Sequence, residues 1–397
     1  MTALALLGEL ASVGGSRAGG YNRLAWTTAD AECREWFAQS ATARGLEVET
    51  DRNGNLWAWL GASIPGKALV IGSHLDSVPR GGAFDGPLGI ASAFAALDAL
   101  RADGFDPGRP LAIAAFADEE GARFGVACAG SRLMTGGLSA DAFRALADLD
   151  GVSTSEAMSS AGITTEHLGL DRERIERIGE YLELHVEQGH LVTSAGMDGL
   201  TAHAPIGLAT EIWPHGRWRV EVVGQQNHAG TTRLSDRDDP MLQLARVILA
   251  VRECAEEAGV LATVGKVRVS PGAVNAIPGS ASAWIDARGP QEQRVRRAIE
   301  RLELSTDVVT IEESWTSSTV FDSAFAEQLA SAIGGEVPRL PSGAGHDAGV
   351  LALAGIPSAM ILVRNPSGIS HAPEEYAEDA DVELGVTALA AAIRSRT

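Results

Sequence analysis

Short apolar runs that end abruptly at polar residues are the main pattern along this chain. Residues 68–71 form one run, Ala-Leu-Val-Ile, and residues 111–117 form another, Leu-Ala-Ile-Ala-Ala-Phe-Ala. Continuous apolar runs of this length predict buried strands. Pro87 opens a longer apolar stretch that continues to Leu97 and predicts a helix with proline in its first turn. Strand and helix patterns alternate in both the first and the last part of the chain, so the sequence predicts an α/β fold.

Candidate catalytic side chains stand directly after these two predicted strands. His74 and Asp76 follow the first run on a predicted loop, and Asp118-Glu119-Glu120 follow the second. In open α/β sheets, ligands bind outside the carboxyl ends of the strands. Three consecutive carboxylates are costly to ionise together unless a cation neutralises them. A solvated acidic turn is the alternative for the three acids, as a hydrogen-bonded loop pair is for His74 and Asp76.

Three further candidate ligands come from separate places in the chain. Asp85 precedes the predicted helix, where it is a candidate N-cap as well as a candidate metal ligand. His185 lies in the alternating segment 181–189, which predicts a strand, and His371 lies in a loop near the C-terminus. Mixed histidine and carboxylate donors suit zinc, manganese, cobalt or nickel. A bridging carboxylate allows two such ions about 3.5–4 Å apart.

The pattern changes between residues 208 and 317. Strands are predicted at 217–223, 262–269, 281–287 and 307–312, with helices at 239–258 and 291–302. This β-α-β-β-α-β order is that of a ferredoxin-like split unit, which is a complete small domain. The sequence therefore predicts one domain formed by residues 1–207 and 318–397, with a second domain, 208–317, inserted into it.

Composition narrows the class of partner. A chain of 397 residues exceeds one ordinary domain, and its net charge of −20 argues against nucleic acid, which needs a basic surface. No apolar run is long enough to span a membrane, and the first residues lack the basic region of a signal peptide. Three widely spaced cysteines do not suggest a disulfide framework. We therefore expect a cytoplasmic protein without membrane or nucleic-acid partners.

Seven motifs of this chain occur in the order found in one enzyme superfamily. They are GSHLDSV (72–78), GGAFDGPLG (81–89), DEEGARF (118–124), ELHVEQG (183–189), NHAGTT (227–232), GAGHDA (343–348) and GISHAPEE (368–375). By these motifs the chain resembles the metallopeptidase-like amidohydrolases related to carboxypeptidase G and aminoacylase. Within them it resembles the hydantoinase/carbamoylase branch, which includes N-carbamoyl-L-amino acid hydrolases, β-ureidopropionases and allantoate amidohydrolases.

This resemblance implies two divalent metal ions per subunit, with zinc, manganese, cobalt or nickel as candidates. Asp85 would bridge the ions, His74 and His185 would complete one site, and Glu120 and His371 would complete the other. Many peptidases of the superfamily have a carboxylate at the position of His185, so the histidine favours the carbamoylase branch.

The resemblance also implies the residues that act beside the metals. Asp76 is expected to orient His74, and Glu119 is expected to be the general base that later returns a proton to the leaving nitrogen. The inserted domain is expected to act as a lid and a dimerisation domain. From it, His228 would reach the active site of the partner subunit in a homodimer and stabilise the oxyanion.

Four residues are expected to contact a small carboxylate substrate. By the resemblance, Asn275 and Arg288 would bind the substrate carboxylate. Without the resemblance, Arg288 would be interpreted as a surface residue. Gln188 would contact the ureido or acyl group. His346 is a further candidate contact, with a position at the start of a helix as its alternative.

We expect an amidohydrolase that cleaves the carbamoyl C–N bond of N-carbamoyl-L-amino acids and yields the amino acid, carbon dioxide and ammonia. Allantoate amidohydrolase is the alternative, because the motif DEEGARF followed by Gly125 resembles the carbamoylases slightly more than the allantoate enzymes. Arg233 stands after NHAGTT where proline is common in the family, so the edge of the lid, and with it the substrate specificity, is less defined. A metallo-dipeptidase or N-acyl-amino acid hydrolase is less favoured because of His185. A metal-binding regulator on the same fold would have lost Glu119 or a ligand, and all are present.

Overall fold

The computed structural model describes residues 1–191 and 196–397 of the chain. These form two compact units, Met1–Ile212 with Val320–Thr397, and Trp213–Thr319. The domain boundaries expected from the sequence lie at 207/208 and 317/318. The first unit continues to Ile212 because residues 206–212 form strand β6 (Ile206–Ile212), which pairs with β15 (Ser358–Val363).

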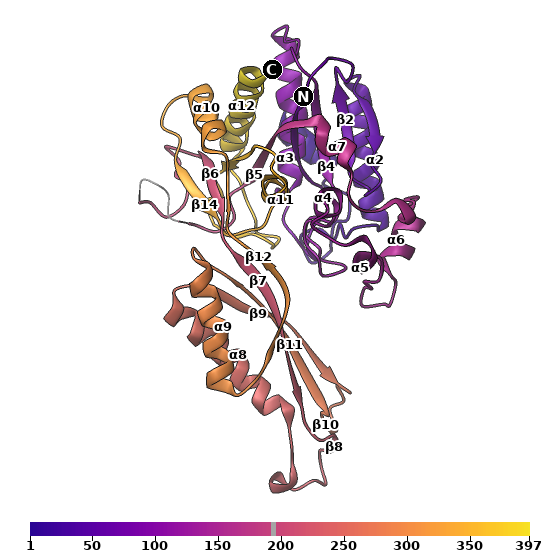
Figure 1. Ribbon diagram of the computed structural model, residues 1–397, viewed down its shortest axis with the longest axis vertical. Coiled ribbons are helices and arrows are strands. Elements are labelled where there is room, and N and C mark those ends of the chain that lie inside the picture. Colours follow the sequence, from indigo (N-terminus) through magenta and orange to yellow (C-terminus); the bar gives the residue numbers. More distant parts are fainter. Residues whose placement is uncertain (192–195) are drawn as a thin grey trace. The chain divides into compact units, whose positions relative to one another are not determined.

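A nine-stranded mixed sheet forms the centre of the larger unit (Figure 1). Its order is β1-β2-β4-β3-β5-β15-β6-β13, and β14 also pairs with β6. Besides β6 and β15, the strands are β1 (Glu47–Thr50), β2 (Leu56–Leu60), β3 (Ala68–His74), β4 (Leu111–Phe116), β5 (Ile178–Val186), β13 (Thr319–Val320) and β14 (Arg339–Ser342). The two apolar runs of the sequence are strands β3 and β4, and both are buried along their whole length.

Four neighbouring strands, β4, β3, β5 and β15, run parallel to one another. Their register pairs His74 at the end of β3 with Phe116 at the end of β4. His185 is the penultimate residue of β5. Since carboxyl ends of parallel strands share one edge, the loops that follow them meet there. The expectation that His74 lies on a loop is wrong, because the β3 ladder extends through it.

Helices pack on both faces of this sheet. Val70 and Ile71 belong to different apolar clusters, because successive side chains of a strand point to opposite faces. Helices α1, α2, α3, α10 and α12 contribute to the cluster of Ile71, whereas α4 and α11 contribute to that of Val70. The α-helices of this unit are α1 (Ala3–Glu9), α2 (Thr28–Ala43), α3 (Pro87–Ala102), α4 (Ala129–Thr135), α5 (Ala140–Arg144), α6 (Thr154–Ser160), α7 (Arg172–Arg177), α10 (Ser323–Ile333), α11 (Asp347–Leu353) and α12 (Asp379–Arg396).

Helix α3 begins next to a tight turn that carries Asp85. Gly86 is the N-cap residue, with φ of 84° and no side-chain capping bond. The alternative role of Asp85 as N-cap is therefore wrong. A Cβ atom at Gly86 would lie 2.5 Å from Cε1 of His74, so only glycine lets the turn approach that ring. The side chain of Asp85 is left available for other contacts.

The smaller unit has the element order read from the sequence. Its antiparallel sheet has the order β12-β7-β11-β9. Side chains of α8 and α9 join those of the sheet in one apolar cluster. The elements are β7 (His215–Val223), α8 (Pro240–Ala258), β9 (Leu261–Ser270), β11 (Ser280–Arg288), α9 (Glu292–Thr306) and β12 (Thr310–Thr316), with a separate small pair formed by β8 (Asn227–His228) and β10 (Ala276–Ile277).

The expected mixed α/β fold class is confirmed. Among the described residues, no helix combines the length and the apolar character needed to span a membrane.

Candidate metal centre

The carboxylate of Asp85 lies between three histidine rings. Its Oδ1 atom is 3.5 Å from Nε2 of His74 and 3.2 Å from Nε2 of His185. Its Oδ2 atom is 3.2 Å from Nε2 of His371. The two oxygens of one carboxylate thus face two separate groups of donors. This is the arrangement of a carboxylate that bridges two cations.

The rings of His74 and His185 are oriented by backbone carbonyls. Nδ1 of His74 lies 3.0 Å from the carbonyl oxygen of Asp76, and Nδ1 of His185 lies 2.9 Å from that of Val186. A proton on each Nδ1 satisfies these contacts and leaves the Nε2 lone pair for a ligand. Both Nε2 atoms are buried and have no hydrogen-bond partner.

Glu120 and His371 form the second donor group together with Asp85. Oε2 of Glu120 lies 3.4 Å from Nε2 of His371. Burial and the nearby Asp85 raise the pKa of Glu120 to about 7. Burial lowers the pKa of His371, but Asp85 and Glu120 outweigh it and raise that pKa to about 9. His371 also has a φ of 58°, a sparsely populated conformation for a residue with a side chain.

Asp76 connects the loop after β3 to the acidic turn after β4. Its carbonyl oxygen contacts His74, whereas its carboxylate accepts hydrogen bonds of 3.1 Å from the backbone N–H groups of both Glu119 and Glu120. Its Oδ1 atom is 3.5 Å from Nδ1 of His74. Asp76 thus positions the two glutamates through their backbone as well as contacting the histidine.

Glu119 lies beside the first donor group. Its Oε2 atom is 3.9 Å from Nε2 of His74, and its Oε1 atom is 3.7 Å from the thiol sulfur of Cys128. Burial holds the pKa of Glu119 well above its usual value, although His74 acts in the opposite direction. A buried carboxyl next to a cation site is suited to accept and release a proton.

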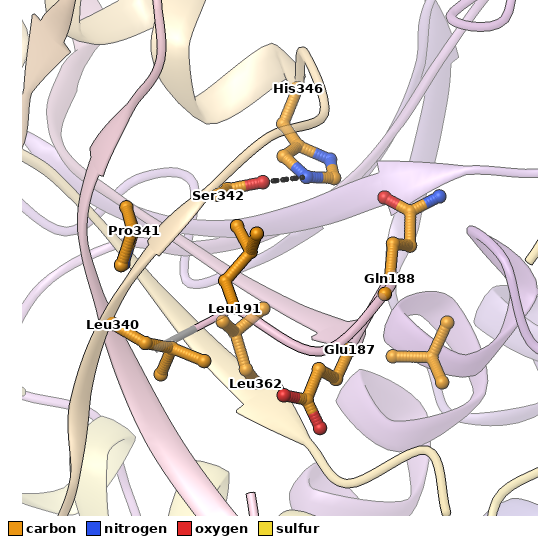
Figure 2. Close-up of a pocket in the computed structure, with 10 residues that line it drawn as sticks. Glu187, Gln188, Leu191, Leu340, Pro341, Ser342, His346 and Leu362 are labelled. Carbon is orange, nitrogen blue, oxygen red and sulfur yellow. Dashed lines mark hydrogen bonds between the residues drawn. The ribbon is translucent and has the colours of Figure 1, made fainter. Parts of the chain in front are cut away.

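Gln188 and His346 line one small pocket at the end of β5 (Figure 2). Nε2 of Gln188 donates to Oδ2 of Asp85 at 2.9 Å, while its Oε1 atom is buried without a partner. His346 is the N-cap residue of α11, but its side chain makes no capping bond. Its Nε2 atom lies 3.1 Å from the hydroxyl of Ser342, and its Nδ1 atom has no partner. Two residues that line this pocket therefore each have one buried polar atom without a hydrogen-bond partner.

Two predicted site residues of the smaller unit lie side by side. β8 and β10 pair His228 with Ala276, and the N–H of Ala229 donates to the carbonyl of Asn275. Nδ1 of His228 accepts hydrogen bonds from the N–H groups of Gly230 and Thr231, at 2.9 and 3.2 Å. The proton of this ring is therefore on Nε2, which is the donor available to a ligand.

Arg288 lies at the other end of β11 from these two residues. It pairs with His215 at the beginning of β7, whereas Ser280, at the opposite end of β11, pairs with Val223. Eight steps along an antiparallel strand span roughly 27 Å. Nε of Arg288 donates to Oδ1 of Asp286 at 2.8 Å. Within one such unit, Arg288 is thus far from His228 and Asn275.

The donor set fits divalent metal ions. Among the described residues, three groups of side chains offer ligand atoms within 4.8 Å of one another. Two of them share Asp85, one with His74 and His185 and the other with Glu120 and His371, and the third is formed by Glu183, His185 and His346. The buried nitrogen lone pairs of His74 and His185, and the carboxylates crowded beside them, are costly unless a cation binds them. Imidazole and carboxylate donors are the ligands expected for zinc, manganese, cobalt or nickel.

Peptidase family M20/M25/M40 matches residues 70–395. The chain belongs to this family. The expected relationship to metallopeptidase-like hydrolases is therefore confirmed.

Individual relatives of the family fall in the expected branch. The chain is 34% identical to an N-carbamoyl-L-amino acid amidohydrolase of Geobacillus stearothermophilus, over 96% of this chain and 94% of the relative. It is 31% identical to an allantoate amidohydrolase of Escherichia coli, over 96% and 94%. An amidase of the hydantoinase/carbamoylase family from Burkholderia vietnamiensis has a similar structure, with a TM-score of 0.89, 28% identity and coverage of 99% and 96%.

Several polar residues that surround this centre were not predicted from the sequence. Glu375 and Ser370 lie in the motif GISHAPEE, and both contact the Asp85 loop. Glu183 and Asp347 are buried carboxylates, and burial raises the pKa of each. The only signal for these residues was their place inside the motifs, next to residues with recognisable roles.

Proposed function

We propose that this protein is a dimetal amidohydrolase that hydrolyses the carbamoyl C–N bond of N-carbamoyl-L-amino acids, with the amino acid, carbon dioxide and ammonia as products. The observation that carries the proposal is the position of Asp85. Its Oδ1 atom faces His74 and His185, and its Oδ2 atom faces His371. A protein that only needed a structural ion would have no use for two donor groups that share one carboxylate and stand beside a buried acid.

In this proposal the five ligands are those of the two donor groups. His74 and His185 hold one ion, Glu120 and His371 hold the other, and Asp85 bridges them. Bound divalent ions would polarise the scissile carbonyl and make a water molecule more acidic. The identity of the metal among zinc, manganese, cobalt and nickel belongs to the same proposal.

Glu119 is the general base of the proposed reaction. Its carboxylate accepts a proton from the attacking water and later delivers it to the leaving nitrogen. Asp76 fixes its backbone by accepting the Glu119 N–H at 3.1 Å. The thiol of Cys128 faces Oε1 at 3.7 Å, so the opposite oxygen, Oε2, is the one that faces the donor group of His74.

The substrate class rests on the relatives and on the pocket. An unsatisfied acceptor on Gln188 and an unsatisfied nitrogen on His346 suit a small planar ureido group, which has both N–H donors and a carbonyl acceptor. The carbamoylase relative is 34% identical and the allantoate amidohydrolase relative 31%. Allantoate is therefore the alternative substrate and has no better support than the carbamoyl amino acids.

Residues of the smaller unit complete the proposed site. Nε2–H of His228 is the donor that stabilises the oxyanion, because Nδ1 is occupied by two backbone N–H groups. Asn275 and Arg288 bind the substrate carboxylate. Arg288 and the His228–Asn275 pair lie at opposite ends of β11, so one copy of this unit is too extended to place all three around one small substrate.

This separation supports a homodimer with shared sites. One subunit would supply Arg288, and the other would supply His228 and Asn275. An antiparallel sheet with the open edge strand β9 is suited to a twofold contact between identical units. The smaller unit would then serve as lid and dimerisation domain.

A substrate panel tests the proposed function. The protein is stripped with a chelator, reloaded with Mn²⁺, Co²⁺, Zn²⁺ or Ni²⁺, and assayed for ammonia and amine release. The panel contains N-carbamoyl-L-amino acids, their D-enantiomers, ureidopropionate, allantoate, N-formyl amino acids and dipeptides. We expect the highest kcat/KM for an N-carbamoyl-L-amino acid, with no turnover before metal is restored. A higher kcat/KM for allantoate or a dipeptide would replace the proposed substrate class.

A further inference from the structure

Glu375 reaches from the C-terminal loop into the turn that carries Asp85. Its Oε1 atom accepts hydrogen bonds from the backbone N–H groups of Phe84, at 3.0 Å, and of Asp85, at 2.9 Å. The residue is only 5% exposed. A carboxylate that binds two consecutive backbone N–H groups fixes the orientation of the peptide between them. The backbone of the candidate bridging ligand is thus held by a residue 290 positions further along the chain.

The other oxygen of Glu375 reaches the side chain of the same ligand. The Ser370 hydroxyl lies 3.0 Å from Oε2 of Glu375 and 3.3 Å from Oδ2 of Asp85. Gln188 donates both to this hydroxyl, at 3.1 Å, and to Oδ2 of Asp85, at 2.9 Å. Ser370 therefore joins Glu375 to the carboxylate oxygen that faces His371.

Close packing leaves this contact little freedom. A Cβ atom at Gly82 would lie 2.1 Å from Oε1 and 2.5 Å from Cβ of Glu375, so this end of the Asp85 turn packs closely against the glutamate side chain. At the other end of the turn, Gly86 packs closely against the ring of His74. The Asp85 turn is thus enclosed between one candidate ligand, His74, and Glu375.

We propose that Glu375 is a positioning residue that sets the bridging geometry of Asp85 relative to His371. His371 and Glu375 belong to one short loop, so the same segment supplies a ligand and fixes the ligand that this histidine must face. The inference rests on the proposed function only in that Asp85 and His371 bind metal. Glu375 touches neither the substrate nor the reacting atoms in this role.

A purely structural role makes a different prediction. Helix α3 begins directly after the Asp85 turn, and its N-cap residue Gly86 makes no side-chain capping bond. In a purely structural role, Glu375 would only stabilise this turn at the start of the helix. In that case its removal would lower stability with and without metal by the same amount. Positioning of Asp85 instead predicts that the metal-bound state is affected more than the metal-free state.

Metal binding distinguishes these roles without any substrate. Chelator-stripped wild type, Glu375→Ala, Glu375→Gln and Asp85→Ala are titrated with Mn²⁺ by calorimetry, and their Tm is measured with and without Mn²⁺. Glu374→Ala is the matched control, because Glu374 is the exposed neighbour in the same loop. We expect Glu375→Ala to weaken Mn²⁺ binding about 10–100-fold and to reduce the rise of Tm on Mn²⁺ addition.

Glu375→Gln should bind Mn²⁺ close to the wild type, because its amide oxygen can accept both backbone N–H groups and its amide nitrogen can donate to Ser370. Wild-type Mn²⁺ affinity in Glu375→Ala, with only a lower metal-free Tm, would overturn the inference. Equal losses in Glu375→Gln and Glu375→Ala would overturn it too, because charge alone would then matter. If Asp85→Ala binds two Mn²⁺ ions like the wild type, the proposed metal site itself fails.

Discussion

The carboxylate of Asp76 accepts a 3.1 Å hydrogen bond from the backbone N–H of Glu119, and this bond joins the loop after β3 to the turn after β4. A second bond of the same length holds the N–H of Glu120. The two glutamates are adjacent in sequence, but one faces His74 and the other His371. Their backbone is therefore fixed by one residue while their side chains serve different groups.

This geometry predicts separable effects of substituting the two glutamates. Glu119→Gln keeps the size of the side chain and removes the proton acceptor, so kcat should fall about 10²–10⁴-fold or more. Metal content, measured by atomic emission, and substrate affinity should remain near the wild type. Steady-state kinetics with the best substrate of the panel provides the measurement.

Glu120→Gln is the matched control for that variant. This substitution makes the same chemical change at the neighbouring residue. Because Oε2 of Glu120 lies 3.4 Å from Nε2 of His371, loss of the Glu120 carboxylate should lower the metal content. Near-normal kcat in Glu119→Gln would mean that another group is the base. Loss of metal from Glu119→Gln would make it a ligand.

Replacement of Asp85 should affect both ions. Asp85→Ala removes the oxygens that lie between His74, His185 and His371, so each donor group loses its shared member. We expect both ions to be lost together and activity to disappear. Metal analysis of the purified variant that finds two ions per chain would contradict the bridging assignment, and one retained ion would limit Asp85 to a single site.

The sequence could predict the candidate ligands of this centre because the chemistry of their side chains, and for His74 and Glu120 their place after apolar strands, can be recognised in it. The sequence could not predict which residues hold these side chains in position. Glu375 and Asp85 are 290 positions apart, and no local pattern indicates that one accepts the N–H of the other. The N-cap alternative for Asp85 failed for a related reason, since a glycine with positive φ takes that position. The need for glycine at position 86 arises from the ring of His74, which packs against Gly86.

The separation of Arg288 from Asn275 follows from the predicted strand 281–287, which lies between them, and the register of β11 agrees with it. The pairing of β8 with β10, which places His228 beside Asn275, could not be predicted from the sequence. Strand β6 was missed because its apolar residues merge with the segment before the smaller unit. Elements with strong periodicity were predictable, whereas pairings between distant segments depend on tertiary packing.

Asp30 provides a test of how burial sets the pH dependence of stability. It lies in the first turn of α2, and its Oδ2 atom accepts the N–H of Trp26 at 2.9 Å. Burial raises its pKa from 3.8 to about 6. Between about pH 4 and pH 6 the folded state therefore binds this proton more tightly than the unfolded state, so its contribution to stability falls as pH rises.

Asp30→Asn should remove that pH dependence, because the amide oxygen can still accept the N–H of Trp26 and carries no charge. The free energy of unfolding of the variant minus that of the wild type should rise from pH 4 to pH 6, by up to about 3 kcal/mol. Urea unfolding of metal-free proteins measures it. Asp379→Asn, at an exposed position in the first turn of α12, is the control. A difference that stays constant with pH would show that Asp30 does not titrate in this range.

The last prediction concerns the proposed sharing of active sites between subunits. Glu119→Gln and His228→Ala should each be nearly inactive alone. If His228 acts in the partner's site, a mixed dimer of these variants contains one site with both intact residues. Random exchange makes half of the dimers mixed, so about a quarter of the wild-type activity should return. Activity is followed with time after mixing, and mixed dimers are identified by differently sized tags.

A second mixture makes the test specific to the two ends of β11. His228 and Asn275 lie side by side, so both would be contributed by the same subunit to the same site. Mixing His228→Ala with Asn275→Ala should therefore restore nothing, because either site of the mixed dimer lacks one of the two. Asn275→Ala mixed with Glu119→Gln should restore activity as His228→Ala does. If exchange is demonstrated and no pair regains activity, each chain must use its own His228, and the extended distance between Arg288 and Asn275 would have to be closed within one subunit.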